Sequence, residues 1–143
     1  MVDRTLILRK LSYLEDYYSQ IHEYKDITLE QYAIDWKIQR IIERTVQMMI
    51  ETCSDISGHI ISDRKYRVPN SYAETFEVLH ENNIISKVQA NSLGKLAKFR
   101  NVVVHDYDRV DGEIVIGILK NNLTDFIKFK EAIIAFLSTS LVE

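Results

Sequence analysis

A short segment of the chain, residues 100–107, contains an arginine, an asparagine, a histidine and a tyrosine around three valines. Arg100 keeps its positive charge at any physiological pH and can bind two oxygens of one phosphate. The imidazole of His105 can accept or donate a proton near neutral pH. Cleavage of RNA without a metal needs a base for the 2′-hydroxyl proton, an acid for the departing 5′-oxygen and positive charge for the transition state. Arg100 and His105 have the side-chain types that such a cleavage uses, and they are our candidate catalytic residues.

The polar residues around this segment can be placed by helical spacing, because residues three and four positions apart share a face. Asn101 becomes a direct neighbour of His105, where it either hydrogen-bonds the imidazole or a phosphate oxygen, or caps the helix end. Asp106 either fixes the tautomer of His105 or caps the following turn. Lys95 and Lys98 lie earlier on the same helix and are the cations that we expect to contact RNA.

The three valines indicate an enclosed segment. Val102, Val103 and Val104 would point in three directions about 100° apart, more than the single apolar stripe of a surface helix requires. We expect them to be enclosed by their own bundle and by a partner subunit. A single histidine also supplies only one of the two proton-transfer groups. A two-fold dimer places two copies of His105 and of Arg100 in one cleft, so we predict a homodimer with a shared site.

These residues resemble the motif of a known family. The spacing of Arg100, His105 and Tyr107 is similar to the R-x4-H-x-Y motif of the HepT-like toxins, which are HEPN-domain ribonucleases. The resemblance implies a metal-independent endoribonuclease, the toxin of a HepT/MntA-like toxin–antitoxin pair. It also implies an all-α fold, a HEPN-type bundle of about five to six helices in a two-fold dimer, with residues 1–143 as a single HEPN domain. Further similarity runs along nearly the whole chain, at Leu11, Tyr13, Leu14, Ile42–Arg44, Glu51–Ile56, Gly58–Ile61, Pro69, Tyr72–Phe76 and Asp106–Asp111.

The same resemblance assigns Tyr107 as the acceptor of AMP from a partner, an MNT-type nucleotidyltransferase that acts as the antitoxin. A bulky anion two residues from His105 would repel RNA and occupy its cleft, which would silence the ribonuclease. Spacing alone also permits Tyr107 to be an aromatic that packs at the end of a helix. A second interpretation of the chain also stays open: a non-catalytic helical dimer that binds a nucleotidyltransferase, in which Arg100 and His105 are structural.

The composition limits the class of protein. At 143 residues, 46% of them apolar, the chain is long enough for one domain with a sizeable core. Its net charge of −3 argues against general coating of nucleic acid, so any RNA contact must be local. The single cysteine, Cys53, lies in an apolar run, which excludes an intrachain disulfide and suggests a reducing compartment.

We expect neither a metal nor another cofactor. The four histidines are far apart, without a metal-ligand spacing, and the chain has no glycine-rich nucleotide-binding motif. The amino terminus lacks the apolar block of a secretory signal, and no segment reaches the roughly 18 apolar residues of a membrane span. The expectation is therefore a cytoplasmic protein without a membrane partner.

Apolar residues recur every three or four positions through most of the chain, which predicts a helical bundle. One helix is expected over about residues 3–24. Thr28 and Gln31 are spaced as in a capping box and predict a long helix from there to Ser62.

The second half of the chain predicts further helices. Capping-box pairs begin at Ser71 and Ser86 and predict a helix directly after each of them. Residues 113–119 are rich in β-branched residues and fit either a strand or a helix. We favour a short helix capped by Asp111, because a lone strand would have no partner in this chain. A final helix is indicated by the apolar residues Leu123, Phe126, Ile127, Ile133, Ile134 and Leu137.

Overall fold

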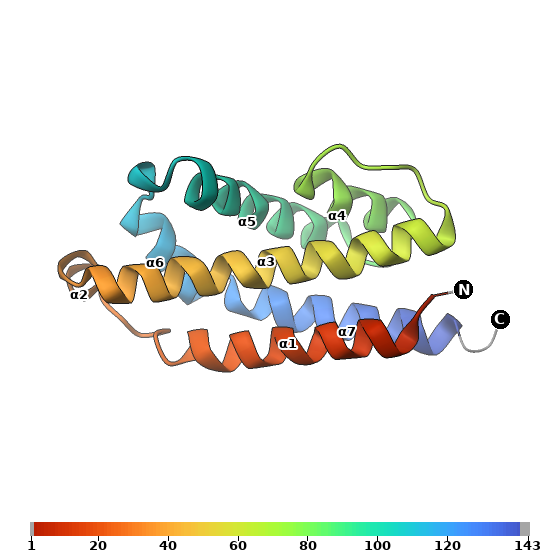
Figure 1. Ribbon diagram of the computed structural model, residues 1–143, viewed down its shortest axis with the longest axis horizontal. Helices are drawn as coiled ribbons and strands as arrows, with labels where there is room; N and C mark the ends of the chain where they lie inside the picture. Colours follow the sequence, from red (N-terminus) through yellow and green to blue (C-terminus); the bar gives the residue numbers. More distant parts are fainter. Residues whose placement is uncertain (1, 141–143) are drawn as a thin grey trace.

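The computed structural model describes residues 2–140 of the chain. Every regular element in this range is helical, which confirms the predicted all-α fold. In chain order the elements are α1 (Arg4–His22), α2 (Leu29–Ile34), α3 (Trp36–Arg64), α4 (Tyr72–Glu81), α5 (Lys87–His105), the 3-10 turn η1 (Tyr107–Arg109), α6 (Gly112–Asn121) and α7 (Leu123–Ser140). Figure 1 shows α3 along the length of the molecule, with α1 and α7 on one side of it and α4 and α5 on the other.

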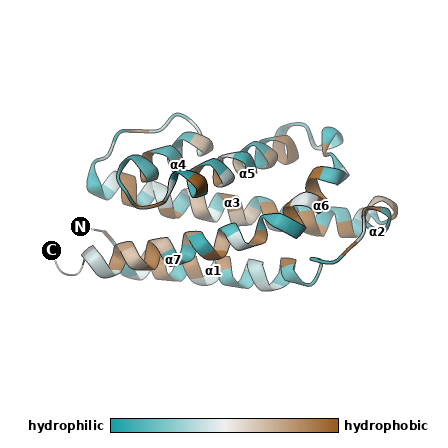
Figure 2. Cartoon of the chain, turned by 180° about the vertical axis from the view of Figure 1, so that it is seen from behind, coloured by the Kyte–Doolittle hydropathy of each residue, from teal (hydrophilic) through white to brown (hydrophobic). Residues whose placement is uncertain are grey.

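Helix α3 is the longest element, and its 29 residues extend for about 44 Å at 1.5 Å per residue. Helix α1 packs along it. Hydrophobic and hydrophilic residues alternate along most of the helices (Figure 2), as amphipathic packing requires. Within residues 2–140, no helix combines the length and the apolar character needed to cross a membrane. The buried apolar side chains recur at helical spacing, as predicted: Ile7, Leu11, Leu14 and Ile21 on α1, and Ile42, Val46, Met49, Ile50, Cys53, Ile56, Ile60 and Ile61 on α3.

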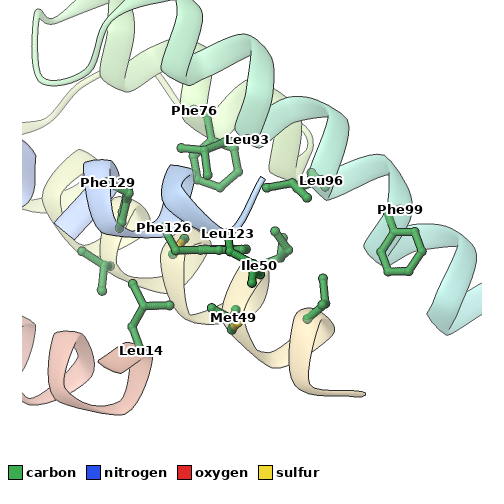
Figure 3. Close-up of a cluster of buried hydrophobic side chains, with 14 of the residues drawn as sticks. Leu14, Met49, Ile50, Phe76, Leu93, Leu96, Phe99, Leu123, Phe126 and Phe129 are labelled. Carbon is green, nitrogen blue, oxygen red and sulfur yellow. The ribbon is translucent and has the colours of Figure 1, made fainter. Parts of the chain in front are cut away.

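Side chains from five helices meet in the centre of the bundle (Figure 3). Phe76 of α4 and Phe129 of α7 are fully buried and contact each other edge to face, with ring centroids 6.4 Å apart. Cys53 lies in the same core, and burial raises the pKa of its thiol. Helix α5, which carries the predicted site, is packed against α3 and α4 and buries Leu93 and Leu96 in this core.

The long helix that we predicted over residues 28–62 is two helices, separated at Asp35. The backbone of Asp35 is extended, with φ −124° and ψ 99°. Its carboxylate accepts hydrogen bonds from the amides of Lys37 and Ile38, at 3.0 and 3.2 Å. These bonds satisfy amides at the start of α3 that have no partner within that helix. The prediction was wrong because the apolar spacing runs on through the break, although Ile34 is 86% exposed.

The other predicted helix starts are confirmed. The hydroxyls of Ser71 and Ser86 each accept a hydrogen bond from the backbone amide three residues later, both at 3.1 Å. Residues 113–119 are helical, as we favoured, and the carboxylate of Asp111 accepts a hydrogen bond from the amide of Glu113 at 2.9 Å. Local capping therefore determines where α4, α5 and α6 begin.

Gly112, the first residue of α6, allows this helix to pack closely on α2. A Cβ atom at Gly112 would lie 3.0 Å from Cδ1 of Leu29 and 3.4 Å from the ring of Tyr32. Because glycine has no side chain, α6 can approach α2 without displacing either residue. The close contact holds the connection between α5 and α6, including η1, at one end of the molecule (Figure 1).

The separation at Asp35 gives a first prediction. Asp35→Ala removes the acceptor for two amides at the start of α3, so we expect the free energy of unfolding to fall by about 1 kcal/mol. Urea unfolding followed by circular dichroism measures the change. Asp16→Ala is the matched control, because Asp16 is an exposed aspartate inside α1, and this variant should lose no stability. Equal stability of the two variants would contradict the proposed cap.

Candidate active site

Arg100 reaches from α5 to α3, where Glu51 holds its guanidinium group. Nε and Nη2 of Arg100 both donate to Oε1 of Glu51, at 3.2 and 2.9 Å. Gln47, one turn earlier on α3, donates to the same oxygen at 3.0 Å. The Arg100 side chain is only 15% exposed, and a cation in such a setting needs a partner of opposite charge. Glu51 is the partner that the position of Arg100 demands.

Two further side chains contact the same guanidinium. The ring of Tyr72, at the start of α4, lies 4.6 Å from its central carbon in a cation–π contact. Asn101 accepts a hydrogen bond from Nη1 of Arg100 at 3.3 Å. We expected Asn101 to bond His105 or a phosphate oxygen, or to cap the helix. Neither the bond to His105 nor the cap is present in the described chain, and the bond to a phosphate oxygen stays a prediction. We call the group formed by Gln47, Glu51, Tyr72, Arg100 and Asn101 the arginine cluster.

Glu51 is ionised at neutral pH. Its partial burial acts to raise the pKa of the carboxyl, but hydrogen bonds from Gln47 and Arg100 act in the opposite direction. The positive charges of Arg100 and Arg44 add to them, so the pKa of Glu51 is held below its usual value. At neutral pH, Glu51 of α3 and Arg100 of α5 therefore form a charged pair.

His105 is the last residue of α5, and its side chain is exposed. Asn101 precedes it by one helical turn on the same face. Within residues 2–140, no hydrogen bond or ion pair engages the imidazole. Both ring nitrogens are thus open to exchange protons with a bound molecule.

The chain itself does not enclose the three valines near His105. Val104 is 38% exposed, and Val102 and Val103 are only partly buried. Val103 packs against the core of its own bundle, whereas Val102 and Val104 do not, so the expectation that the bundle encloses all three valines is wrong. The reason is visible in Figure 1, where the last turns of α5 extend beyond the first residues of α4, so α4 does not cover them.

Tyr107 lies in η1, which directly follows α5. It is 66% exposed, so it is not a packing aromatic that closes the helix. The side chain of Asp106 neither caps η1 nor bonds His105, contrary to both expected roles. The backbone closes this turn instead: the amide of Asp106 donates to the carbonyl of Val102, and its carbonyl accepts from the amide of Arg109, both at 2.8 Å.

A cleft of about 810 Å³ opens beside Tyr107, between η1, α2, α6 and the start of α3. It is lined in part by Glu43, which is 5% exposed. The carboxylate of Glu43 accepts a hydrogen bond from the hydroxyl of Tyr32 at 2.8 Å and another from Arg40 at 3.1 Å. Burial, and then the bond to Glu43, raise the pKa of Tyr32, so its hydroxyl remains a donor. Sequence reasoning did not single out this pair.

Lys95 and Lys98 line a second cleft, of about 680 Å³, formed by α4, α5 and the loop before α4. Neither lysine has an ion-pair partner in the part of the chain that the structure describes. Arg67 lines the same cleft, but its charge is matched by Glu74 at 2.6 Å and Glu81 at 2.8 Å. The two lysines therefore remain available to an anion on the helix that carries the site.

The structure brings some of the predicted site residues together and not others. Arg100 and Asn101 meet in the arginine cluster, whereas His105 and Tyr107 are exposed at the end of α5 and beyond it. Sequence reasoning missed Glu51, Gln47 and Tyr72 as partners of Arg100. The i, i+4 spacing of Gln47 and Glu51 is a weak signal for a polar pair, but it does not indicate which helix they face. Among residues 2–140, no group of three His, Cys, Asp or Glu side chains is arranged to hold a metal ion.

Comparisons with known proteins support one family. The chain is 31% identical over 103 residues to the mRNA nuclease HepT of Shewanella oneidensis, covering 72% of this chain and 77% of that protein. It is 25% identical over 138 residues to the tRNA nuclease HepT of Aphanizomenon flos-aquae, covering 96% and 94%.

Solved structures agree with the sequence comparisons. The fold matches a tri-AMPylated Shewanella oneidensis HEPN toxin, solved in complex with an MNT antitoxin, with a TM-score of 0.85 and 29% identity over 94% of this chain and 99% of that one. It also matches a toxin–antitoxin structure with AMP-PNP, with a TM-score of 0.86 and 28% identity over 92% and 99%. The family model described as Ribonuclease HepT-like matches residues 14–133. The chain therefore belongs to the HepT-like ribonuclease family.

Proposed function

We propose that this chain is a metal-independent endoribonuclease, a single HEPN domain that acts as the toxin of a HepT/MntA-like pair. One observation carries the proposal: Arg100 is held in a defined orientation, and an unengaged His105 lies five residues later on the exposed end of the same helix. A fixed cation and a free proton-transfer group are what metal-free RNA cleavage requires. Family membership and the nuclease names of the relatives favour RNA as the substrate.

The proposed reaction is an internal transfer within RNA. A base removes the proton from a 2′-hydroxyl, and the 2′-oxygen then attacks the adjacent phosphorus. The bond from phosphorus to the 5′-oxygen breaks, an acid protonates that oxygen, and the products end in a 2′,3′-cyclic phosphate and a 5′-hydroxyl. Arg100 stabilises the negative charge on the phosphate oxygens, and His105 is the proton-transfer group.

Each chain supplies one His105, although the reaction needs both a base and an acid. We therefore assign the two proton transfers to the His105 residues of two protomers in a homodimer. The exposed Val104 and the partly exposed Val102 and Val103 support a partner at this end of α5, because apolar side chains gain from being covered.

RNA is expected to approach along α5. Lys98 precedes Asn101 by one helical turn, and Lys95 lies one turn earlier still, so both flank the arginine cluster. Their charges are unmatched in the described chain and can bind the phosphates on one side of the cut.

Tyr107 is the proposed control point. Its hydroxyl would attack the α-phosphorus of ATP, pyrophosphate would leave, and the hydroxyl proton would pass to a base of an MNT-type nucleotidyltransferase antitoxin. The 66% exposure of Tyr107 is consistent with access by such a partner, and the similar toxin from Shewanella oneidensis carries AMP in complex with an MNT antitoxin. The added phosphates would repel RNA from nearby His105.

The catalytic prediction concerns Arg100 and His105. Arg100→Ala and His105→Ala should each lower the rate of RNA cleavage at least about 100-fold, because a charge donor or a proton-transfer group is lost. Gel analysis of labelled RNA measures the rates. His22→Ala is the control, because His22 is an exposed histidine on α1, and it should cleave like the wild type.

The products distinguish this mechanism from others. EDTA should leave cleavage unchanged, and mass spectrometry should find 2′,3′-cyclic phosphate ends. Dependence on a metal, or 5′-phosphate ends, would require another mechanism. Purified protein without any cleavage activity would favour the alternative, a non-catalytic helical dimer that binds a nucleotidyltransferase.

The dimer prediction is tested in solution. Analytical ultracentrifugation at micromolar concentration should give about twice the 16.8 kDa mass of one chain. Val104→Glu should shift the protein toward the monomer and reduce cleavage, because it places a charge on the proposed interface. Val88→Glu changes an exposed valine at the opposite end of α5 and should remain a dimer. A fully active monomer would contradict the shared site.

The last of these predictions concerns Tyr107. Tyr107→Phe should keep its ribonuclease activity but escape silencing, because it retains the ring and loses the acceptor oxygen. Incubation with the partner enzyme and ATP, followed by intact-mass measurement, should add AMP-sized masses to the wild type and to Tyr13→Phe only. Tyr13 is an exposed tyrosine on α1. Equal modification of Tyr107→Phe would place the acceptor elsewhere.

A further inference from the structure

Arg100 is held by side chains from three helices, although its proposed task needs only its charge. We propose that Glu51 is a positioning residue that presents Arg100 to the RNA phosphate, with Gln47 and Tyr72 completing the hold. This inference rests on the proposed function, because it concerns the same phosphodiester cleavage. Glu51 itself would not touch the substrate.

The hydrogen bonds leave two of the guanidinium donors without a partner. The group has five N–H donors in one plane. Nε and Nη2 each donate once to Oε1 of Glu51, and Nη1 donates once to Asn101. Two donors remain, one on Nη1 and one on Nη2. A pair of donors on these two nitrogens suits two oxygens of a phosphate.

Tyr72 restricts the guanidinium further. The ring centroid lies 4.6 Å from the central carbon of the guanidinium, and this cation–π contact limits the movement of the group. Gln47 donates to the oxygen of Glu51 that also receives Arg100, at 3.0 Å, and thereby orients the carboxylate. Together these contacts restrict the orientations that Arg100 can adopt.

A role in positioning explains the negative charge beside a catalytic cation. Glu51 offsets part of the charge that Arg100 can offer to the transition state, so a carboxylate at this place opposes purely electrostatic catalysis. It is useful if the gain from a fixed geometry exceeds that loss, since small misplacements of a catalytic group can lower a rate by about 100-fold. An ion pair whose only role was to join α3 to α5 would not require particular donors of Arg100 to stay unbonded.

The test measures kcat and KM on a short fluorogenic RNA for Glu51→Ala, Glu51→Gln, Arg100→Ala and the double variant Glu51→Ala/Arg100→Ala. Glu51→Ala should lower kcat by about 10- to 100-fold with a smaller change in KM, because the lost orientation matters most in the transition state. Glu51→Gln keeps an acceptor oxygen and should stay within a few-fold of the wild type. The double variant should be no slower than Arg100→Ala, because Glu51 acts through Arg100.

Glu15→Ala is the matched control. It also removes the acidic partner of an interhelical ion pair, with Lys130 between α1 and α7, and should keep wild-type kcat. Thermal melts show whether each variant is folded at the assay temperature. If Glu51→Ala does not fold, Gln47→Ala serves instead, since it frees the carboxylate and leaves the ion pair in place. That variant should lower kcat by a few-fold.

Each outcome bears on a separate claim. Wild-type kcat in Glu51→Ala or, where that variant does not fold, in Gln47→Ala would overturn the positioning role while leaving the proposed function intact, provided that Arg100→Ala is still impaired. A double variant slower than Arg100→Ala would show that Glu51 acts independently of Arg100, and would also overturn it. If the wild type cleaves no RNA, the proposed function fails. NMR of the Arg100 Nε–H then tests whether Glu51 restrains Arg100 in the absence of activity. The Nε–H should be protected from hydrogen exchange in the wild type and lose this protection in Glu51→Ala, and unchanged protection would overturn the positioning role.

Discussion

The structure around the site depends on one charged guanidinium, that of Arg100, which lies at the contact between α3 and α5 and must be paired there. Arg100 is mostly withdrawn from water, so it needs an acidic partner within hydrogen-bonding distance. That partner, Glu51, lies on a different helix, so the ion pair fixes how far α5 is shifted along α3. Apolar side chains buried on the same helix, such as Leu96 and Phe99, stabilise its packing without such a directional requirement.

A second carboxylate on α3, that of Glu43, also accepts a hydrogen bond from a neighbouring helix. Glu43 precedes Glu51 by eight residues, or about 12 Å along the helix axis. It bonds Tyr32 of α2, as Glu51 bonds Arg100 of α5. Each of these two acids therefore accepts hydrogen bonds from one neighbouring helix, α2 or α5. The apolar face of α3 packs in the core. Tyr32 in turn lies beside Gly112 at the start of α6, so the two acids of α3 support the elements on both sides of η1.

Much of the fold could be predicted from the sequence, because its causes are local. Capping residues such as Ser71, Ser86 and Asp111 bond amides two or three positions away, and the apolar spacing reports which face is buried. Asp35 shows the limit of periodicity: an apolar pattern continued across it, although its carboxylate begins a new helix. The type of each element was therefore more predictable than its continuity.

Only part of the candidate site could be predicted in the same way. Arg100 and His105 could be identified from their chemistry and spacing. Their surroundings could not, because the contact from Glu51 to Arg100 spans 49 positions and depends on how α3 and α5 cross. The fate of Asp106 was missed for a different reason: backbone hydrogen bonds already close that turn, and a sequence does not show whether a capping side chain is redundant.

The position of Cys53 has a practical consequence. It is the only thiol in the chain, it is 0% exposed in the middle of α3, and burial raises its pKa, so a thiol reagent meets neither an accessible nor an ionised sulfur. Labelling can proceed only when the bundle opens, and its rate therefore reports the population of open molecules. The natural Cys53 thiol can therefore report opening of the bundle without an engineered label. Loosening of the bundle by any ligand, partner or substitution can be read from a single mass increment.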